Sequence, residues 1–424
     1  MAQLDGATPR APRVVLLVTR DTKAAEADYL IGALARLGVH THVIDTAIRQ
    51  SPGLTKSELM RRASEDCGTR IQALIERGAR AIVGMGGGTG SWIAMNAMQT
   101  APFGFPKVMI STLAFDPRDF CTASDIIVVP SVADLAGLND MLRRVLDNCA
   151  AAVAGMARVT DVPAAGRVGS SAIGVTALGI TDGAVSALRR ELAARGHEVT
   201  SFHANGFGGR AFERWTAKGA FRAVIDLTTH EINSMLFGGS APAGDDRLKA
   251  AALHGVPQVV VPGGIDVLSR GPIVTLTLGE RERAHYAQGV MFTHLRATRP
   301  ELRRAAAAMA ERLNERTAAV RVVLPTGGFS REGEAGGAVH DPAGDRAFID
   351  ALCDALRGDI PVFEEPWPIN DPRFAAALGG HLDAVIAVHD GLVAASAARG
   401  GRTRSGPFAV PQRVSGDRAP APLH

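Results

Sequence analysis

AIVGMGGGTGS, at residues 81–91, is the stretch of sequence that decides the fold. Its first residues, Ala81 to Val83, have the apolar character of a short buried strand, and they lead directly into a loop dense in glycine. Such a loop lets backbone N–H groups converge on an anion, while the helix that follows presents its positive end. The stretch therefore predicts a strand–loop–helix unit of a parallel α/β domain, with a phosphorylated ligand bound on the loop.

The loop fits neither standard nucleotide-loop pattern. Ser91 stands where a Walker loop requires lysine, and the glycines lack the G-x-G-x-x-G spacing. The alternative is a tight turn that needs glycine only for close packing. We expect the ligand-binding residues of this loop to be Gly86, Gly87, Gly88, Thr89, Gly90 and Ser91.

Strands and helices alternate on both sides of this loop. Strands are expected at Val14 to Val18 and Val39 to Ile44 before it, and at Val108 to Ser111 and Ile126 to Val129 after it. Glycines close the helical segments between the early strands, at Gly38 and Gly78. This alternation predicts a doubly wound, mainly parallel sheet.

The same order restarts after residue 160. A strand at Ser170 to Thr176, a helix at Ala184 to Arg195 closed by Gly196, and a strand at Glu198 to Phe202 repeat the opening segments. An internal duplication explains this repetition, and generic α/β similarity is the alternative. The expected regions are an N-terminal Rossmann-like nucleotide-binding subdomain (1–160), a C-terminal Rossmann-like subdomain (161–395) that opens with a linker (160–169), and a disordered basic tail (396–424).

Composition narrows the class of function. Aromatic residues make up 5% of the 424 residues and the formal net charge is +3, so we expect no nucleic-acid partner. The apolar runs have strand length, which predicts no membrane partner. The four cysteines are far apart in the sequence, without a disulfide or zinc pattern. We therefore expect a cytoplasmic protein that binds small molecules.

Polar residues also follow other strands of the first subdomain. Open parallel sheets bind ligands just outside the carboxyl ends of their strands. Asp21, Thr22 and Lys23 follow the first strand, where they could hold a metal-phosphate or a ribose; a helix cap and a solvated lysine are the alternative. Asp45 and Ser111 end two further strands, so we expect them on the same edge.

The second half offers candidates for chemistry. His203 is the side chain most readily poised for proton transfer near neutral pH, although a structural role is the alternative. Asp226, His230 and Glu231 match no strong metal spacing, so no metal is assigned. We take His203, Asp226 and Glu231 as candidate catalytic residues. The candidate substrate-binding residues are Gly208, Gly209, Arg210, Gly263, Gly264, Thr326, Gly327 and Gly328.

Several segments together resemble a known family. They are TRDTKAAEADYL (19–30), GMGGGTGS (84–91), SDIIVVPSVADLAGLN (124–139), FHANGFGGRAFE (202–213), DLTTHEINSMLFGG (226–239), VPGGID (261–266) and LPTGGFS (324–330). The chain is similar to the ATP-binding domain of plant tobamovirus-resistance proteins and to its uncharacterised bacterial relatives. It departs from that family at HYAQ (285–288) and THLR (293–296), where a histidine-asparagine-proline stretch is usual.

The resemblance implies two Rossmann-like subdomains, a homodimer, and ATP, with or without Mg²⁺, in the first subdomain. It assigns ATP binding to Gly86 through Gly90, with Asp21 and Lys23 beside them. We expect an enzyme that acts on a small phosphorylated or carboxylate metabolite in a cleft between the subdomains. A nucleotide-responsive regulatory or protein-binding module without turnover is the alternative, because the sequence contains no recognisable catalytic motif.

Overall fold

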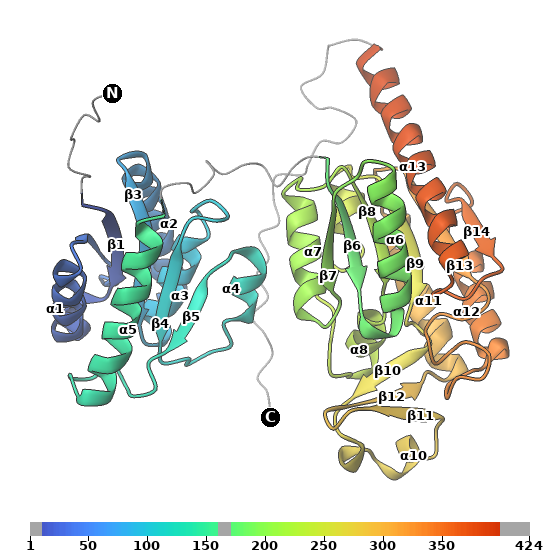
Figure 1. The fold of residues 1–424 in the computed structure, drawn as a ribbon, viewed down its shortest axis with the longest axis horizontal. Helices are drawn as coiled ribbons and strands as arrows, with labels where there is room; N and C mark the ends of the chain where they lie inside the picture. Colours follow the sequence, from blue (N-terminus) through green and yellow to red (C-terminus); the bar gives the residue numbers. More distant parts are fainter. Residues whose placement is uncertain (1–10, 160–170, 399–424) are drawn as a thin grey trace, which may run out of the picture. The chain divides into compact units, whose positions relative to one another are not determined.

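The computed structural model describes residues 11–159 and 171–398, without the side chains of 396–398. Its contacts divide the chain into two units, Met1–Gly166 and Arg167–His424 (Figure 1). The predicted linker at 160–169 lies outside the described residues, and so does the predicted tail from residue 399 onward. Within the described residues, no helix is both long enough and apolar enough to cross a membrane.

Unit 1 is one parallel sheet, called sheet A here, between two layers of helices. The strand order is β2-β1-β3-β4-β5. The strands are β1 (Arg13–Val18), β2 (His40–Asp45), β3 (Ala79–Gly86), β4 (Lys107–Ser111) and β5 (Ile127–Pro130). The helices are α1 (Arg20–Arg36), α2 (Lys56–Glu76), α3 (Gly88–Met98), α4 (Arg118–Ala123) and α5 (Asp140–Ala157). Alternate residues of β1 face opposite layers, so Val14 and Leu16 pack with α1 and α5 while Val15 and Leu17 pack with α2 and α3.

Unit 2 has a second parallel sheet, called sheet B here, in the order β14-β13-β9-β8-β6-β7. The strands are β6 (Ile173–Ala177), β7 (Val199–His203), β8 (Ala223–Thr228), β9 (Gln258–Gly263), β13 (Val320–Pro325) and β14 (Val362–Glu365). The helices are α6 (Asp182–Ala194), α7 (Phe207–Ala217), α8 (Glu231–Phe237), α9 (Ala250–Leu253), α11 (Arg299–Asn314), α12 (Pro342–Ala355) and α13 (Pro372–Ala398). Helices α6 and α13 cover one face, and α8, α11 and α12 cover the other.

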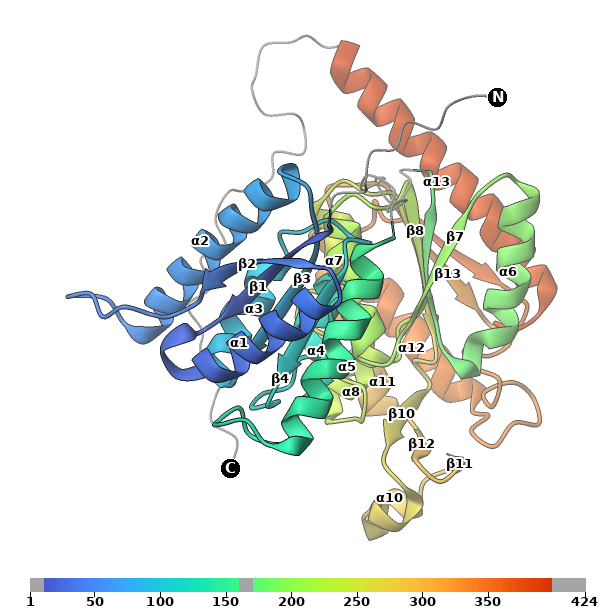
Figure 2. The same cartoon turned by 60° about the vertical axis from the view of Figure 1, so that its left-hand side comes forward.

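Residues 267–296 form an arm that projects from unit 2 (Figures 1 and 2). The arm is a small antiparallel sheet in the order β10-β12-β11, and α10 lies in the connection between β10 and β11. Its elements are β10 (Val267–Arg270), α10 (Leu278–Arg281), β11 (His285–Gln288) and β12 (Phe292–Arg296). The sequence pattern did not predict it, because these strands are short and the arm lies outside the βα alternation.

The predicted fold class is confirmed. Both main sheets are parallel, and the predicted helix-closing glycines Gly38, Gly78 and Gly196 have the positive φ angles 71°, 89° and 83°. The order β2-β1-β3-β4 in sheet A matches β7-β6-β8-β9 in sheet B, as a duplication requires. Unrelated doubly wound domains share this order, so the duplication stays a hypothesis.

Candidate functional site

The glycine loop lies at the carboxyl edge of sheet A, between β3 and α3. Gly87 is the cap residue of α3, with φ −80° and ψ −160°. The Ser91 N–H donates to the Gly87 carbonyl at 2.8 Å. In a helix the N–H groups before that first bond have no intrahelical acceptor, so those of Gly88, Thr89 and Gly90 are available to a ligand.

The glycines of this loop serve two different purposes. A Cβ at Gly86 would lie 2.9 Å from the Ser91 nitrogen and 3.0 Å from the Gly90 carbonyl carbon, so Gly86 is required for close packing. A Cβ at Gly87 would have Thr112 Oγ1 as its nearest neighbour, at 3.9 Å. At Gly87, therefore, the bare backbone is not explained by packing and leaves room for a ligand.

Two predicted ligand-binding serines are part of the support of the loop. The buried Ser91 hydroxyl donates to the Gly86 carbonyl at 2.8 Å and lies 2.9 Å from the buried Ser111 hydroxyl. Ser111 Oγ also accepts the Leu113 N–H at 3.1 Å. These bonds fix β3, β4 and α3 relative to one another, so both hydroxyls hold the loop in shape.

The remaining predicted residues of unit 1 lie along the same edge. Asp21 and Thr22 are exposed in the first turn of α1, and Lys23 stands at a kink in that helix, with φ −131°. Asp45 Oδ1 accepts the N–H groups of Arg20 at 3.1 Å and Ala47 at 3.0 Å. The structure thus brings the ends of β1, β2 and β3 together, as the sequence predicted.

Backbone strain is found at this edge as well. Leu113, after β4, and Val132, after β5, have φ angles of 52° and 64° although neither is glycine. Both side chains are exposed, so burial of their apolar surface does not explain the strained backbone. Left-handed backbone at bulky residues is uncommon, and such strain clusters at functional sites.

In unit 2, Asp226 and Glu231 belong to a buried ion cluster. Arg247, fully buried, donates to Glu213 at 2.9 Å, to Glu231 at 3.0 Å and to Asp226. Asp226 also accepts from the Gln258 amide at 2.6 Å. Burial alone would lower the pKa of Arg247, but the carboxylates outweigh it and raise that pKa.

Glu213 completes the cluster by holding the chain segment that carries Arg247. Its carboxylate accepts the N–H groups of Leu248 at 2.7 Å and Ala250 at 2.9 Å. Burial raises the pKa of Glu213. Sequence reasoning missed Glu213 and Arg247, because partners 34 residues apart leave no local motif.

Among the other candidates of unit 2, Gly209 packs directly against the Glu231 carboxylate of this cluster. His203 is exposed at the end of β7. A Cβ at Gly208 would collide with the His203 carbonyl, one at Gly209 with the Glu231 carboxylate, and one at Gly263 with the Leu227 carbonyl. Close packing therefore accounts for these three glycines.

The remaining substrate-binding candidates are spread over one helix and two loops. Arg210 is partly exposed on α7, and Gly264 follows β9 with φ 70°. After β13, Thr326 is exposed and its hydroxyl donates to the Glu365 carbonyl at 3.1 Å. A Cβ at Gly327 would lie 2.5 Å from the Pro368 nitrogen, and Gly328 has φ 134°. In the described part of the chain, no three His, Cys, Asp or Glu side chains are grouped as metal ligands.

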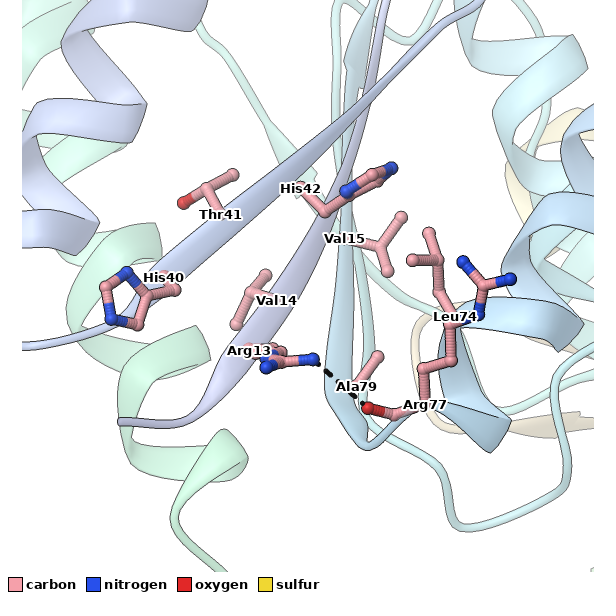
Figure 3. A pocket seen from close by; sticks show the side chains of 9 residues that line it. All are labelled: Arg13, Val14, Val15, His40, Thr41, His42, Leu74, Arg77 and Ala79. Atoms are coloured by element: carbon pink, nitrogen blue, oxygen red, sulfur yellow. Dashed lines mark hydrogen bonds between the residues drawn. The ribbon is translucent and has the colours of Figure 1, made fainter. Parts of the chain in front are cut away.

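An open hollow of about 310 Å³ lies at the opposite, amino edge of sheet A (Figure 3). Arg13, His40 and His42 from the strands line it, with Leu74 and Arg77 from the end of α2 and the segment after it. Arg13 donates to the Arg77 carbonyl at 3.3 Å, which satisfies the end of that helix. The hollow is separate from the glycine loop, which lies at the other end of the same strands.

Comparison with known proteins gives a family match along most of the chain. The N-terminal domain model of "Uncharacterised protein family (UPF0261)" matches residues 51–162, and its C-terminal domain model matches residues 170–386. A UPF0261 protein of Rhizobium meliloti is 35% identical over 88% of this chain and 98% of its own length. One from Clostridium tetani is 31% identical over 87% and 98%.

A plant protein is also similar. The tomato "ToMV resistance protein Tm-1" is 32% identical over 72% of this chain and 41% of its own length. A solved structure of MurG from Acinetobacter baumannii is 9% identical and covers 87% of this chain and 99% of that one. Its TM-score of 0.22 is too low to support any argument.

Proposed function

Because this chain belongs to the UPF0261 family, whose description assigns no activity, we propose its function from its own geometry: unit 1 binds ATP on the glycine loop. The observation that carries the proposal is the set of three N–H groups, of Gly88, Thr89 and Gly90, that precede the first hydrogen bond of α3 beside the open space at Gly87. A helix start of this kind binds phosphate through its N–H groups and its dipole.

The position in the sheet supports the same site. Strand order reverses direction between β1 and β3, and ligands of doubly wound sheets bind outside the carboxyl ends of the strands at such a point. Asp45, at the end of β2, stands where an acidic residue holds a ribose in dinucleotide folds. Asp21 is an exposed carboxylate of this edge, and we propose that it accompanies Mg²⁺ on the phosphates. With ATP as its ligand, we propose a cytoplasmic location for the protein.

Thermal unfolding with and without ATP tests the site. ATP at about 100 times its dissociation constant should stabilise the wild type by about 2.7 kcal/mol. Gly87→Val should abolish this shift without unfolding the chain, because Gly87 has a negative φ and open space. Gly155→Val is the matched control, since Gly155 has open space on the exposed face of α5. A full ATP shift in Gly87→Val contradicts the proposal.

Two uses of the bound nucleotide are distinguished by turnover. The first is an enzyme that acts on a small phosphorylated or carboxylate metabolite and either transfers a phosphoryl group from ATP to it or hydrolyses ATP. This use predicts that adding a panel of such metabolites leads to phosphate release or product formation. The second is a regulatory or protein-binding module without turnover. The ion cluster favours the second, because Asp226 and Glu231 are buried and already paired with Arg247. Steady ATP consumption by the wild type that is lost in Gly87→Val would support the enzyme.

The homodimer is also proposed, with the arm as its interface. Large apolar side chains are exposed on the arm, including Leu278 at 82% and Val290 at 87%. A two-fold axis would place this patch against its own copy. Sedimentation should give a dimer for wild type and a monomer for Leu278→Glu with Val290→Glu. Val388→Glu on α13 is the control, and a dimer that survives the double substitution excludes the arm.

A further inference from the structure

Buried polar atoms without hydrogen-bond partners gather at the carboxyl edge of sheet B. Among the described residues, His230 Nδ1, Asp266 Oδ1 and the Tyr286 hydroxyl have no partner. They come from the loop after β8, the loop after β9 and strand β11 of the arm. Buried polar atoms in proteins nearly always have partners, so three such atoms from three elements need an explanation.

One face of the arm covers this edge. Strand pairing places Ser269, His294 and Tyr286 in one row across β10, β12 and β11. Val267 and Tyr286 of that face pack against Ile180, which follows β6. Ile180 in turn lies against Gly264, where a Cβ would be 2.7 Å from Ile180 Cδ1 and 3.1 Å from His230 Cβ. The unpartnered atoms therefore lie where the arm meets the ends of β6, β8 and β9.

The acidic side of this junction is built from two loops. The Ser330 hydroxyl, after β13, donates to Asp266 Oδ2 at 2.6 Å and accepts the Gly333 N–H at 3.1 Å. Arg296 is 3.9 Å from Asp266 and bonds more closely to Asp345, at 2.7 Å. Burial raises the pKa of Asp266 to about 6, and the charge of Asp345 adds to this effect.

The imidazoles of the junction are neutral at neutral pH. Burial lowers the pKa of His230 to about 3, and the nearby His294 adds to this effect. Burial also lowers the pKa of His294 to about 4. His294 is fully bonded, to Ser269 at 2.9 Å and to Gln288 at 2.6 Å, and the Tyr286 ring lies 5.0 Å from its ring. His230 keeps an unused nitrogen.

We propose that the unpartnered atoms of His230, Asp266 and Tyr286, held in place by His294 and Ser330, form a second ligand site, the edge-B site, which binds a small neutral polyhydroxylated molecule of the sugar or alditol class. A hydroxyl group both donates and accepts, so it can satisfy an imidazole nitrogen, a carboxylate oxygen or a phenol. The site lies wholly in unit 2, and its test is independent of ATP binding in unit 1.

Charge argues against an anion in the edge-B site. The nearest guanidinium, Arg296, faces two carboxylates, Asp266 and Asp345. The other buried guanidinium near His230 is Arg247, which is surrounded by its own three carboxylates. Arg331, the neighbour of Ser330, lies within electrostatic reach of Tyr286 but is largely exposed and faces Glu332 at 3.6 Å. Each of these three guanidinium groups thus faces a carboxylate of its own, and a phosphate needs donors where this site offers a carboxylate.

Entry to the edge-B site passes Tyr286. Tyr286 is partly exposed, whereas His230, Asp266, His294 and Ser330 are buried. It belongs to β11, which lies at one edge of the arm's sheet and pairs only with β12 among the described strands. Tyr286 is therefore the residue of the site that a ligand arriving from solvent meets first, so its ring reports on binding.

The chain has two tyrosines, Tyr29 in unit 1 and Tyr286, so ¹⁹F spectra of 3-fluorotyrosine-labelled protein contain one signal for each. Tyr286→Phe assigns them by removing one. The probes are neutral aldoses and alditols of four to six carbons, with inorganic phosphate and ATP titrated separately. We expect at least one neutral probe to shift the Tyr286 signal saturably and to leave Tyr29 unchanged. Phosphate should not move the Tyr286 signal.

Binding calorimetry with that probe gives the second readout. Asp266→Asn should weaken binding at least tenfold, and if it fails to fold, Tyr286→Phe, which removes only a hydroxyl, should still weaken it severalfold. Tyr29→Phe is the matched control with wild-type affinity. The proposal is overturned if no neutral probe moves the Tyr286 signal at concentrations on the order of 100 mM, far above weak dissociation constants. It is equally overturned if phosphate binds there instead, or if Tyr286→Phe binds like wild type.

Discussion

Gly86 and Gly87 are adjacent, yet a methyl group should destabilise the fold at Gly86 and leave it nearly unchanged at Gly87. At Gly86 the new Cβ would meet backbone of the first turn of α3 at 2.9 Å, which neither partner can relieve by a side-chain movement. Gly86→Ala should therefore cost about 1–3 kcal/mol of unfolding free energy. Gly87→Ala should cost close to nothing, because its nearest neighbour is 3.9 Å away. Urea unfolding of both variants checks this, and equal losses would contradict it.

His230 should make the chain sensitive to acid. Burial lowers its pKa in the folded chain to about 3, and His294 of the arm, Arg247 and His203 add to this effect. As pH falls below about 6.5, the unfolded chain takes up the proton first, so the folded state loses stability.

The comparison of His230→Gln with wild type isolates this effect. The wild type should lose about 2–3 kcal/mol more than the variant between about pH 7.5 and pH 4.5, since each unit of pKa shift corresponds to about 1.4 kcal/mol. Urea unfolding at several pH values measures the difference. A stability difference between the two proteins that does not change with pH would show that His230 titrates normally.

At the scale of elements, Arg247 ties α7, β8 and α8 together through Glu213, Asp226 and Glu231. Arg247→Leu leaves these carboxylates buried without their cation and should cost about 3–5 kcal/mol. Arg143→Leu on α5 is the control, because its pair with Asp140 is exposed and should be worth at most about 1 kcal/mol. Chemical unfolding compares the two, and similar small losses would mean that the cluster is not structural.

The elements also show what the sequence could predict. Strands such as Val14 to Val18 and the helix ends at Gly38 and Gly196 were read correctly, because apolar periodicity and the conformational freedom of glycine act locally. The glycine loop was located for the same reason. The partner of Asp226 could not be read, because Arg247 reaches it only after the chain has folded. The arm was missed since its strands are four or five residues long and amphipathic helices do not separate them.

The roles of individual glycines could not be predicted from the sequence either. Gly86 and Gly87 are identical in the pattern, and only the surrounding backbone separates a packing glycine from one beside open space. Ser91 and Ser111 looked like donors to a ligand, whereas their hydroxyls bond to each other at 2.9 Å. Local sequence thus predicts the position of a candidate anion site, but it does not predict which atoms of the loop are available to the ligand.

At the scale of the whole molecule, the division of contacts into two units predicts two thermal transitions. Calorimetry of the full chain should show ATP and Gly86→Ala moving only the transition of unit 1, in opposite directions. Arg247→Leu should lower only that of unit 2, by about 2–4 °C for each kcal/mol lost. A neutral sugar that occupies the edge-B site should raise that second transition and leave the first in place. Each of these ligands and substitutions acts within one unit. A single transition that shifts with all of them would therefore show that the two units unfold together, and that nucleotide binding and the edge-B site are coupled through the folding of the entire chain.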